Sequence, residues 1–342
     1  MEFVTYSDWV QLPERAEALF TQAEKSSIFF SRQWFENLTT EIDDDQSIML
    51  ACVIADNQVM AILPLVMSAG KTGYALKHRY TPVYSLLLAH HDQAGVLSCL
   101  VQGLTRLPLT GLLLEPVADN DNNLLSLQRE MEAAGFSCDR MFRFYNWFLR
   151  VQGQSYEEYM AARPAKLRNT ILRKQRKLDR EHGYTIRLFS GDDVPGGMAD
   201  YYAVYNASWK ATEQYVDFVD AMVARFTQAG WTRLAVLYAR EQPVAAQLWF
   251  VHQGKASIFR LSYDEKWKAY SPGSILTSFL MEYVIDTDKV DEVDFLFGND
   301  AYKQDWMSDR RERFALSCVR SDKQVAWYKR FIVSLRHMLQ RR

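Results

Sequence analysis

The chain has 342 residues, 48% of them hydrophobic, and this length and composition predict two globular domains, each with its own apolar core. The formal net charge is −2, so the chain as a whole has no field that would demand a polyanionic partner. Its four cysteines and six histidines show neither a C-x-x-C pair nor the spacing of a zinc site, which argues against a disulfide framework and predicts no metal.

The sequence also lacks the usual signals for export or membrane insertion. Its first residues, MEFVTYSDWVQLPERAE, lack the basic and apolar blocks of a secretory signal peptide. No apolar stretch reaches 18 residues, because Asp56-Asn57-Gln58 interrupts the longest candidate. We therefore expect a cytoplasmic protein.

The first half alternates apolar runs with an amphipathic helix. Residues 47–54 and 58–67 flank an Asp-Asn turn, as the strands of a hairpin do. A helix is expected over 123–134, because Gly135 offers the left-handed residue that commonly follows a helix. Further strands are expected at 83–88, 110–114 and 143–151. This order predicts a mixed sheet flanked by helices over residues 1–155.

A basic segment connects the two halves at residues 156–184. Seven cations crowd its helical part against only Asp179 and Glu181. They are Lys166, Arg168, Arg173, Lys174, Arg176, Lys177 and Arg180. One interpretation is a face that binds tRNA, a phosphorylated substrate or an acidic membrane. The favoured alternative is a solvated connecting helix, because Leu167, Ile171, Leu172 and Leu178 form an apolar stripe that can dock on a domain.

The second half, residues 185–322, repeats this order of elements. A strand at 185–189 and a helix at 198–209 precede a hairpin of 232–239 and 244–252. A strand at 257–263 then leads through a polar loop into a helix at 275–285. Strands at 292–297 and 313–320 follow, with a helix starting near Tyr302 between them. No repeat is visible in the sequence itself, so the similarity of the halves rests on element order.

The junction of loop and helix at Ser271-Pro272-Gly273-Ser274 predicts a binding site for a pyrophosphate. The first turn of a helix has unpaired N–H groups and the positive end of the helix dipole. Pro272 sets φ at the start of the helix, and Gly273 lets the backbone approach a phosphate closely. The loop and the flanking strands therefore predict a binding site for a donor that carries a nucleotide.

These residues resemble the GNAT-like acyltransferases of the cellulose-biosynthesis CelD type, which are distantly related to the FemABX peptidyltransferases. The resemblance extends from about Tyr156 to Phe314. It is carried by Tyr263-Asp264, the loop 268–274 and the pattern Asp294-x-x-x-Gly298-x-x-x-Tyr302-Lys303-x-x-Trp306. The sequence departs from the usual GNAT loop, Gln/Arg-x-x-Gly-x-Gly/Ala, since only Gly273 matches a glycine position there. The resemblance implies tandem GNAT-like mixed sheets, a FemABX-like pseudo-duplication.

The resemblance also implies a donor site for acyl-CoA, acetyl-CoA or longer, with no metal. Backbone N–H groups near the end of the 257–263 strand would hold the pantetheine and polarise the thioester carbonyl. The residues implied for donor binding are Arg260, Leu261, Ser262, Tyr263, Lys268, Tyr270, Ser271, Gly273 and Ser274. The first half has no comparable Pro-Gly loop, so we interpret it as a degenerate GNAT-like domain that shapes the acceptor cleft.

Three residues are candidates for catalysis of N-acyl transfer. Tyr302 lies where many GNAT enzymes keep the tyrosine that protonates the leaving thiolate, and a half-buried structural tyrosine is the alternative. Asp294 interrupts an apolar strand, where a carboxylate is costly unless it is partnered, so it is a candidate base or amine anchor. Lys303 would pair with Asp294 or bind a substrate anion, unless it is an exposed helix lysine.

Trp209, Trp249 and Asp264 are the candidates for binding the acceptor, although core packing is the default for both tryptophans.

Three functions remain open. The favoured one is an acyl-CoA-dependent N-acyltransferase acting on an amine of a small, cell-envelope or exopolysaccharide-related acceptor. The alternatives are a FemABX-like aminoacyltransferase that uses aminoacyl-tRNA, and a non-catalytic acyl-CoA or ligand-binding module. The slightly acidic charge makes a nucleic-acid partner the weaker expectation. The amphipathic segment 323–342 predicts packing against the first domain, with peripheral membrane contact as the alternative.

Overall fold

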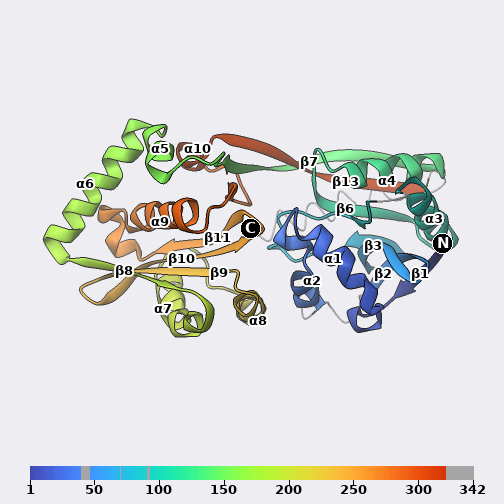
Figure 1. Cartoon of the computed structure of the whole chain (residues 1–342), viewed down its shortest axis with the longest axis horizontal. Helices are drawn as coiled ribbons and strands as arrows, with labels where there is room; N and C mark the ends of the chain where they lie inside the picture. Colours follow the sequence, from blue (N-terminus) through green and yellow to red (C-terminus); the bar gives the residue numbers. More distant parts are fainter. Residues whose placement is uncertain (40–46, 70, 91–92, 321–342) are drawn as a thin grey trace. The chain divides into compact units, whose positions relative to one another are not determined.

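The computed structural model describes residues 1–39, 47–69, 71–90 and 93–320. The segment 323–342, predicted as an amphipathic helix, lies outside them. The chain divides into two compact units (Figure 1). Of the described residues, the first unit comprises those of Met1–Phe144 and of 312–320, and the second comprises Tyr145–Arg311. These ranges differ from the predicted domains in three places: residues 145–155 and the basic helix belong to the second unit, and most of the last strand belongs to the first.

The first unit contains a mixed sheet whose strands follow in the order β1-β2-β3-β4-β6-β13. Strands β2 and β3 form the predicted antiparallel hairpin, with Asp56 and Asn57 at φ of 48° and 61° in the turn. Gly135, at φ +88°, follows α4 as expected. The strands are β1 (Glu2–Tyr6), β2 (Ser47–Ala55), β3 (Gln58–Met67), β4 (Thr72–Ala75), β5 (Leu87–Leu88) and β6 (Gly111–Ala118). The helices are α1 (Glu17–Ala23), α2 (Arg32–Leu38), α3 (Gln93–Arg106) and α4 (Asn122–Ala133).

Two long strands run from one unit into the other. They are β7 (Phe136–Arg150) and β13 (Asp309–Arg320), and both are longer than their predicted ranges. Cys138 on β7 and Cys318 on β13 bring their sulfur atoms to 2.6 Å of each other within the first unit, although 180 residues separate them in the chain. Their spacing in the sequence carried no sign of this proximity.

The second unit contains strands in the order β7-β12-β11-β10-β9-β8, in which β11 and β12 are parallel and the other neighbours antiparallel. Helices α6 and α9 lie on one face of this sheet, and α7 and α8 lie on the other (Figure 1). The strands are β8 (Tyr184–Phe189), β9 (Thr232–Ala239), β10 (Gln242–His252), β11 (Lys255–Tyr263) and β12 (Glu292–Asp294). The helices are α5 (Tyr156–Ala161), α6 (Ala165–His182), α7 (Val194–Asn206), α8 (Val216–Gln228), α9 (Pro272–Glu282) and α10 (Lys303–Trp306).

The core of the second unit lies between the sheet and the helices α6 and α9. Ile171 and Leu178, two of the four stripe residues predicted on the basic helix, are buried there, while Leu172 is 52% exposed. The apolar stripe therefore docks α6 on the second unit, against α9, as the favoured interpretation of this segment requires. After Glu282 the chain continues α9 as a π-helical turn, Tyr283–Thr287. Among the described residues, none of the helices combines the length and the apolar character needed to cross a membrane.

Candidate active site

Strands β11 and β12 separate in the middle of the second unit's sheet. They pair at three positions only, the last being Ser257 opposite Asp294. Strand β12 ends there, not at Phe297 as predicted, because Leu296 at φ +60° and Gly298 at φ +92° turn the chain away. Strand β11 continues to Tyr263 and is paired along this stretch with β10. Within the described part of the chain, β11 thus has an open edge from Ile258 to Tyr263 on the side where β12 has ended.

A β-bulge lies at the start of this open edge. The pairing with β10 shifts between Ile258 and Arg260, which leaves Phe259 as the extra residue. A bulge bends a strand and redirects the backbone groups beyond it. The four strand residues predicted to bind the donor, Arg260, Leu261, Ser262 and Tyr263, all follow it.

Helix α9 begins beside the end of this edge. It starts at Pro272, three residues before the predicted start, and follows Ser271 in a left-handed conformation. Pro272 has no N–H, and the N–H groups of Ser274 and Ile275 both donate to the Ser271 carbonyl, at 3.1 and 3.2 Å. A Cβ on Gly273 would lie 3.1 Å from Cδ1 of Tyr263, so glycine permits the close contact between helix and strand. The predicted loop residues therefore meet the open edge at Tyr263.

A buried hydrogen-bond chain holds the first turn of α9 in place. The Trp249 indole donates to Gln247 Oε1 at 2.9 Å, and Gln247 Nε2 donates to the Gly273 carbonyl at 2.9 Å and to the Thr277 hydroxyl at 2.8 Å. Trp249 is 0% exposed. The prediction that Trp249 contacts the acceptor is therefore wrong, because this side chain has no surface to offer a substrate. Gln247 was missed, although a glutamine within an apolar strand is a signal that could have found it.

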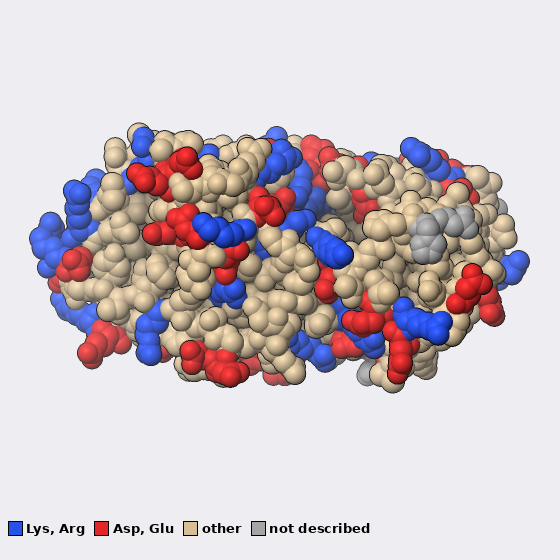
Figure 2. Space-filling model, in the orientation of Figure 1, with Lys and Arg blue, Asp and Glu red and all other residues tan. Residues whose placement is uncertain are grey.

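The basic helix α6 lies against the predicted donor loop. The Lys174 ammonium donates to the Ala269 carbonyl, and the Lys177 ammonium lies 4.6 Å from the centre of the Tyr270 ring. The Tyr270 hydroxyl donates to Glu181 at 2.9 Å and lies 2.8 Å from Nε2 of His182. Lys268 is exposed and pairs with Glu265 at 3.6 Å. Figure 2 shows Lys and Arg side chains gathered where α6 runs, so this helix brings positive charge to the loop.

Tyr302 and Lys303 lie at the start of α10, past the end of β12. Tyr302 is 43% exposed, its ring meets that of Phe295 edge-on at 5.8 Å, and partial burial raises the pKa of its phenol. Lys303 is 6% exposed, which excludes the interpretation as an exposed helix lysine. It pairs with Asp300 at 3.3 Å and donates to the Phe297 carbonyl, not to Asp294 as one prediction had it. Burial lowers the pKa of the Lys303 ammonium.

Asp294 lies in a buried ionic cluster at the point where the strands part. One of its oxygens accepts from Asn146 Nδ2 at 2.5 Å and from the Leu296 N–H at 2.6 Å, and the other accepts from Arg311. Arg311 also donates to Glu292 at 2.8 Å. We call Asp294, Glu292, Arg311 and Asn146 the Asp294 cluster. Every carboxylate in it is matched by donors from the chain.

A second ionic cluster lies on the loop between α7 and α8 and the strand β11. Arg260 donates to Glu213 at 3.0 Å, and Glu213 also accepts from the Tyr215 N–H at 3.1 Å. Lys210 lies in the same loop, with its ammonium 5.5 Å from the centre of the Tyr205 ring. Burial, followed by the charge of Arg260, lowers the pKa of Lys210 to about 7. We call Lys210, Glu213, Arg260 and Lys303 the Lys210 cluster.

The other predicted acceptor residues lie beside this cluster. Trp209 follows the end of α7 and is 51% exposed, with its ring 4.7 Å from that of Tyr263. Trp209 is therefore a surface residue at the end of the open edge. The alternative favoured from the sequence, a tryptophan packed in the core, is wrong for this residue. The Asp264 carboxylate accepts from the Lys266 N–H at 2.9 Å and so caps the short helix that follows. Sequence reasoning missed Lys210 and Glu213, because nothing in the loop's composition distinguishes them from solvated charges.

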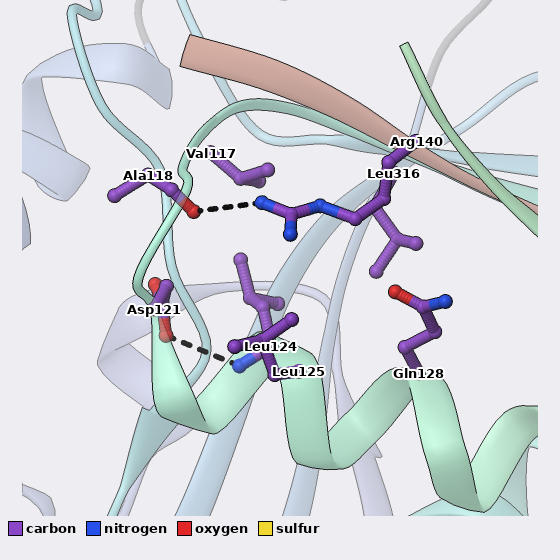
Figure 3. A pocket seen from close by; sticks show the side chains of 8 residues that line it. All are labelled: Val117, Ala118, Asp121, Leu124, Leu125, Gln128, Arg140 and Leu316. Carbon is purple, nitrogen blue, oxygen red and sulfur yellow. Dashed lines mark hydrogen bonds between the residues drawn. The ribbon is translucent and has the colours of Figure 1, made fainter. Parts of the chain in front are cut away.

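Two hollows lie away from these residues. One, in the first unit, has a volume of about 10 Å³ and lies under Arg140, which donates to the Ala118 carbonyl at 3.3 Å, while Asp121 accepts from the Leu124 N–H at 3.1 Å (Figure 3). It is smaller than the roughly 300 Å³ at which ligand pockets begin. The other lies between α7 and α8 and has a volume of about 910 Å³. None of the predicted site residues lines either hollow.

The fold defined by these elements has known counterparts. A structure described as FemX superposes with a TM-score of 0.65 at 10% identity, covering 93% of this chain and 97% of that one. The C-terminal domain of a putative lysylphosphatidylglycerol synthetase from Agrobacterium fabrum gives 0.57 at 12% identity, over 94% and 95%. A tandem GNAT protein from the clavulanic acid biosynthesis pathway gives 0.51 at 11%, over 92% and 97%. The predicted fold class, tandem GNAT-like mixed sheets flanked by helices, is confirmed.

A family model narrows this class for the second unit. Residues 165–304 match the model described as "Acetyltransferase (GNAT) domain". The match runs from the start of α6 to α10 and includes the open edge of β11, the loop before α9 and Tyr302. All of the matched residues lie within the second unit. A search of curated proteins returned no match.

Proposed function

We propose that the chain is an acyl-CoA-dependent N-acyltransferase whose donor lies along β11. The observation that carries this proposal is the open edge of β11, Ile258 to Tyr263, ending against the first turn of α9. A strand edge beyond the end of its neighbouring strand offers N–H and C=O groups to an extended ligand with amide bonds, as pantetheine is. Gly273 at the helix start and the cations of α6 then lie where the nucleotide end of such a donor needs positive charge.

The reaction that we propose is attack of an amine nitrogen on the thioester carbonyl. A C–N bond forms, the C–S bond breaks, the amine loses a proton and the thiolate gains one. N–H groups after the bulge would bind the carbonyl oxygen as its charge develops. Tyr302 is the proposed acid for the thiolate, since a tyrosine phenol carries a proton at neutral pH. Lys303 would supply positive charge beside it.

Asp294 is the candidate whose contacts favour a positioning role. Both of its oxygens accept hydrogen bonds from the chain, from Asn146, Arg311 and the Leu296 N–H. A base must instead present an oxygen to the proton that it abstracts. We propose that Asp294 fixes the turn at Leu296 and thereby keeps β12 apart from β11.

The acceptor is proposed from resemblance alone. The likeness to CelD-type proteins supports an amine on a small, cell-envelope or exopolysaccharide-related molecule, and a cytoplasmic location, with peripheral contact to a membrane as a variant of that location. A fold by itself hosts many activities, so the acceptor needs its own experiment.

Calorimetric titration with acetyl-CoA and with longer acyl-CoAs tests the donor. We expect binding by the wild type and at least tenfold weaker binding by Gly273→Val, because the added side chain would meet Tyr263 and fill the space above the helix start. Gly196→Val on α7 is the matched control, since a Cβ there meets no atom within 4 Å. Equal affinity of the wild type and Gly273→Val would refute the placement of the donor.

The contact between α6 and the donor loop supports a second candidate, an aminoacyltransferase that uses aminoacyl-tRNA. Lys174 and Lys177 would then neutralise phosphates of the RNA. In that case the logarithm of tRNA affinity falls linearly with the logarithm of salt concentration, with a slope set by the number of phosphates contacted. Replacing Arg173, Lys174, Arg176 and Lys177 by glutamine should flatten this slope. A sub-micromolar complex with tRNA at physiological salt would favour this candidate over acyl-CoA.

A further inference from the structure

The charges of the Lys210 cluster are not balanced. Arg260 and Glu213 form one pair at 3.0 Å, and Lys303 and Asp300 form another at 3.3 Å. Lys210 remains. In the part of the chain that the structure describes, no carboxylate pairs with its ammonium, which lies near the rings of Tyr205 and Trp209. The charged groups that act on it are Arg260 from β11, Glu213 from its own loop and Lys303 from α10.

A half-buried cation without a counter-ion is costly, because burial removes its water and two neighbouring cations repel it. The Asp294 cluster in the same unit shows that this chain can place a matching carboxylate beside a buried cation. Lys210 is the third cation of its cluster, and the described residues place no third carboxylate beside it. A ligand with negative charge would complete the cluster and remove the repulsion.

The position of Lys210 indicates which ligand this is. Helix α9 and the donor loop lie on one face of the sheet, and α7 and α8, whose connecting loop carries Lys210, lie on the other (Figure 1). Arg260 reaches Glu213 of that loop from β11, directly after the bulge. The Lys210 cluster therefore adjoins the open edge of β11 from the side opposite to the proposed donor site.

We propose that Lys210, with Arg260 beside it, binds an anionic group, a carboxylate or a phosphate, on the molecule that accepts the acyl group. This deepens the proposed function and rests on it for naming the ligand as the acceptor. An acceptor with both an amine and an anion would be held by its anion at Lys210, while its amine faces the thioester at the open edge. Neutral amines of the same size would bind poorly.

Selective acylation of lysines tests the site without requiring activity. The full-length protein is treated at pH 7.5 with a neutral amine-acylating reagent, N-acetoxysuccinimide, and labelling is mapped by mass spectrometry. Lys210 should react faster than the exposed Lys25 of the first unit, because a larger share of it is uncharged. Inorganic phosphate or acetate at constant ionic strength should slow labelling of Lys210 at least about threefold, the effect of a one-unit rise in its pKa. Labelling of Lys25 should not change.

Comparing phosphate with acetate identifies the anionic group that the site binds, and two variants of Arg260 test whether the charge of this residue is needed. Protection by phosphate alone indicates a phosphate-bearing acceptor, protection by acetate alone a carboxylate, and protection by both supports the site for either. Arg260→Gln should abolish the protection and Arg260→Lys should retain part of it, which separates loss of charge from loss of fold. Rapid labelling that neither anion slows would overturn the proposal. Because acetyl-CoA is absent from this assay, failure to bind the donor would refute the proposed function without touching this result.

Discussion

The two ionic clusters of the second unit differ in one respect that separates a structural role from a functional one. In the Asp294 cluster Arg311 faces two carboxylates, and every oxygen of Asp294 accepts a hydrogen bond from the chain. In the Lys210 cluster one ammonium pairs with no carboxylate of the residues that the structure describes. A completed buried cluster resists change, because removing a member leaves an uncompensated charge. An incomplete one is held in place by its surroundings and gains stability from a ligand.

Replacing Tyr302 tests whether the region next to the incomplete cluster performs the chemistry. Tyr302→Phe keeps the ring against Phe295 and removes the phenol proton. A positioned acid contributes about 10²–10⁴-fold, so the turnover number for acyl transfer should fall by that factor while the dissociation constant of acetyl-CoA stays constant. Steady-state kinetics and calorimetry give the two numbers, and a thermal melt checks the fold. A decrease of less than tenfold would assign Tyr302 to packing.

Replacing Arg311 tests the completed cluster. Arg311→Met leaves the buried carboxylate of Asp294 and the half-buried carboxylate of Glu292 without their cation, so we expect the free energy of unfolding to drop by about 3–5 kcal/mol. Asp294→Asn should cost less, because Glu292 still neutralises Arg311. Arg150→Met is the control, since its pair with Asp309 is exposed and such pairs contribute about 0–1 kcal/mol. Urea unfolding measures all three variants.

The variant Asp294→Asn also distinguishes two roles for Asp294. If Asp294 is the base, Asp294→Asn loses the acidic limb of the pH–rate profile. If it positions the turn at Leu296, turnover falls together with stability and the limb persists. An acidic limb that disappears while stability is unchanged would contradict the positioning role.

The pH dependence of stability provides the most specific test of the incomplete cluster. The pKa of Lys210 is about 7 in the folded protein and lies near 10.4 in an unfolded chain, so between these values the unfolded state binds more protons. Stability therefore rises with pH across this window on account of Lys210. We expect Lys210→Met to be more stable than the wild type at pH 7 and to lose this advantage as the pH approaches 10. Urea midpoints at intervals between pH 7 and 9.5, with Lys25→Met as control, measure the difference. Parallel curves for wild type and Lys210→Met would contradict the lowered pKa.

Much of the fold was predictable because it depends on local pattern. The hairpins β2–β3 and β9–β10, the strand β11 and the amphipathic α4 and α9 follow from alternation, helical periodicity and turn residues. The helix start at Pro272-Gly273 was predicted from residues whose backbone preferences are strong. Helices α3 and α8 were not predicted, although both have an apolar face, because no distinct capping signal marked them out.

The sequence by itself determined the strands, the loop and the helix that make up the open edge, since each is encoded within a few neighbouring residues. Only the tertiary structure decided what each polar side chain faces. It buried Trp249 behind Gln247, surrounded Asp294 with donors from residues 146 and 311, and placed Lys210 near Arg260 and Lys303. These partners are 2 to 148 residues apart in the chain. Whether a charge is matched depends on distance in space and on burial, and a linear pattern contains neither.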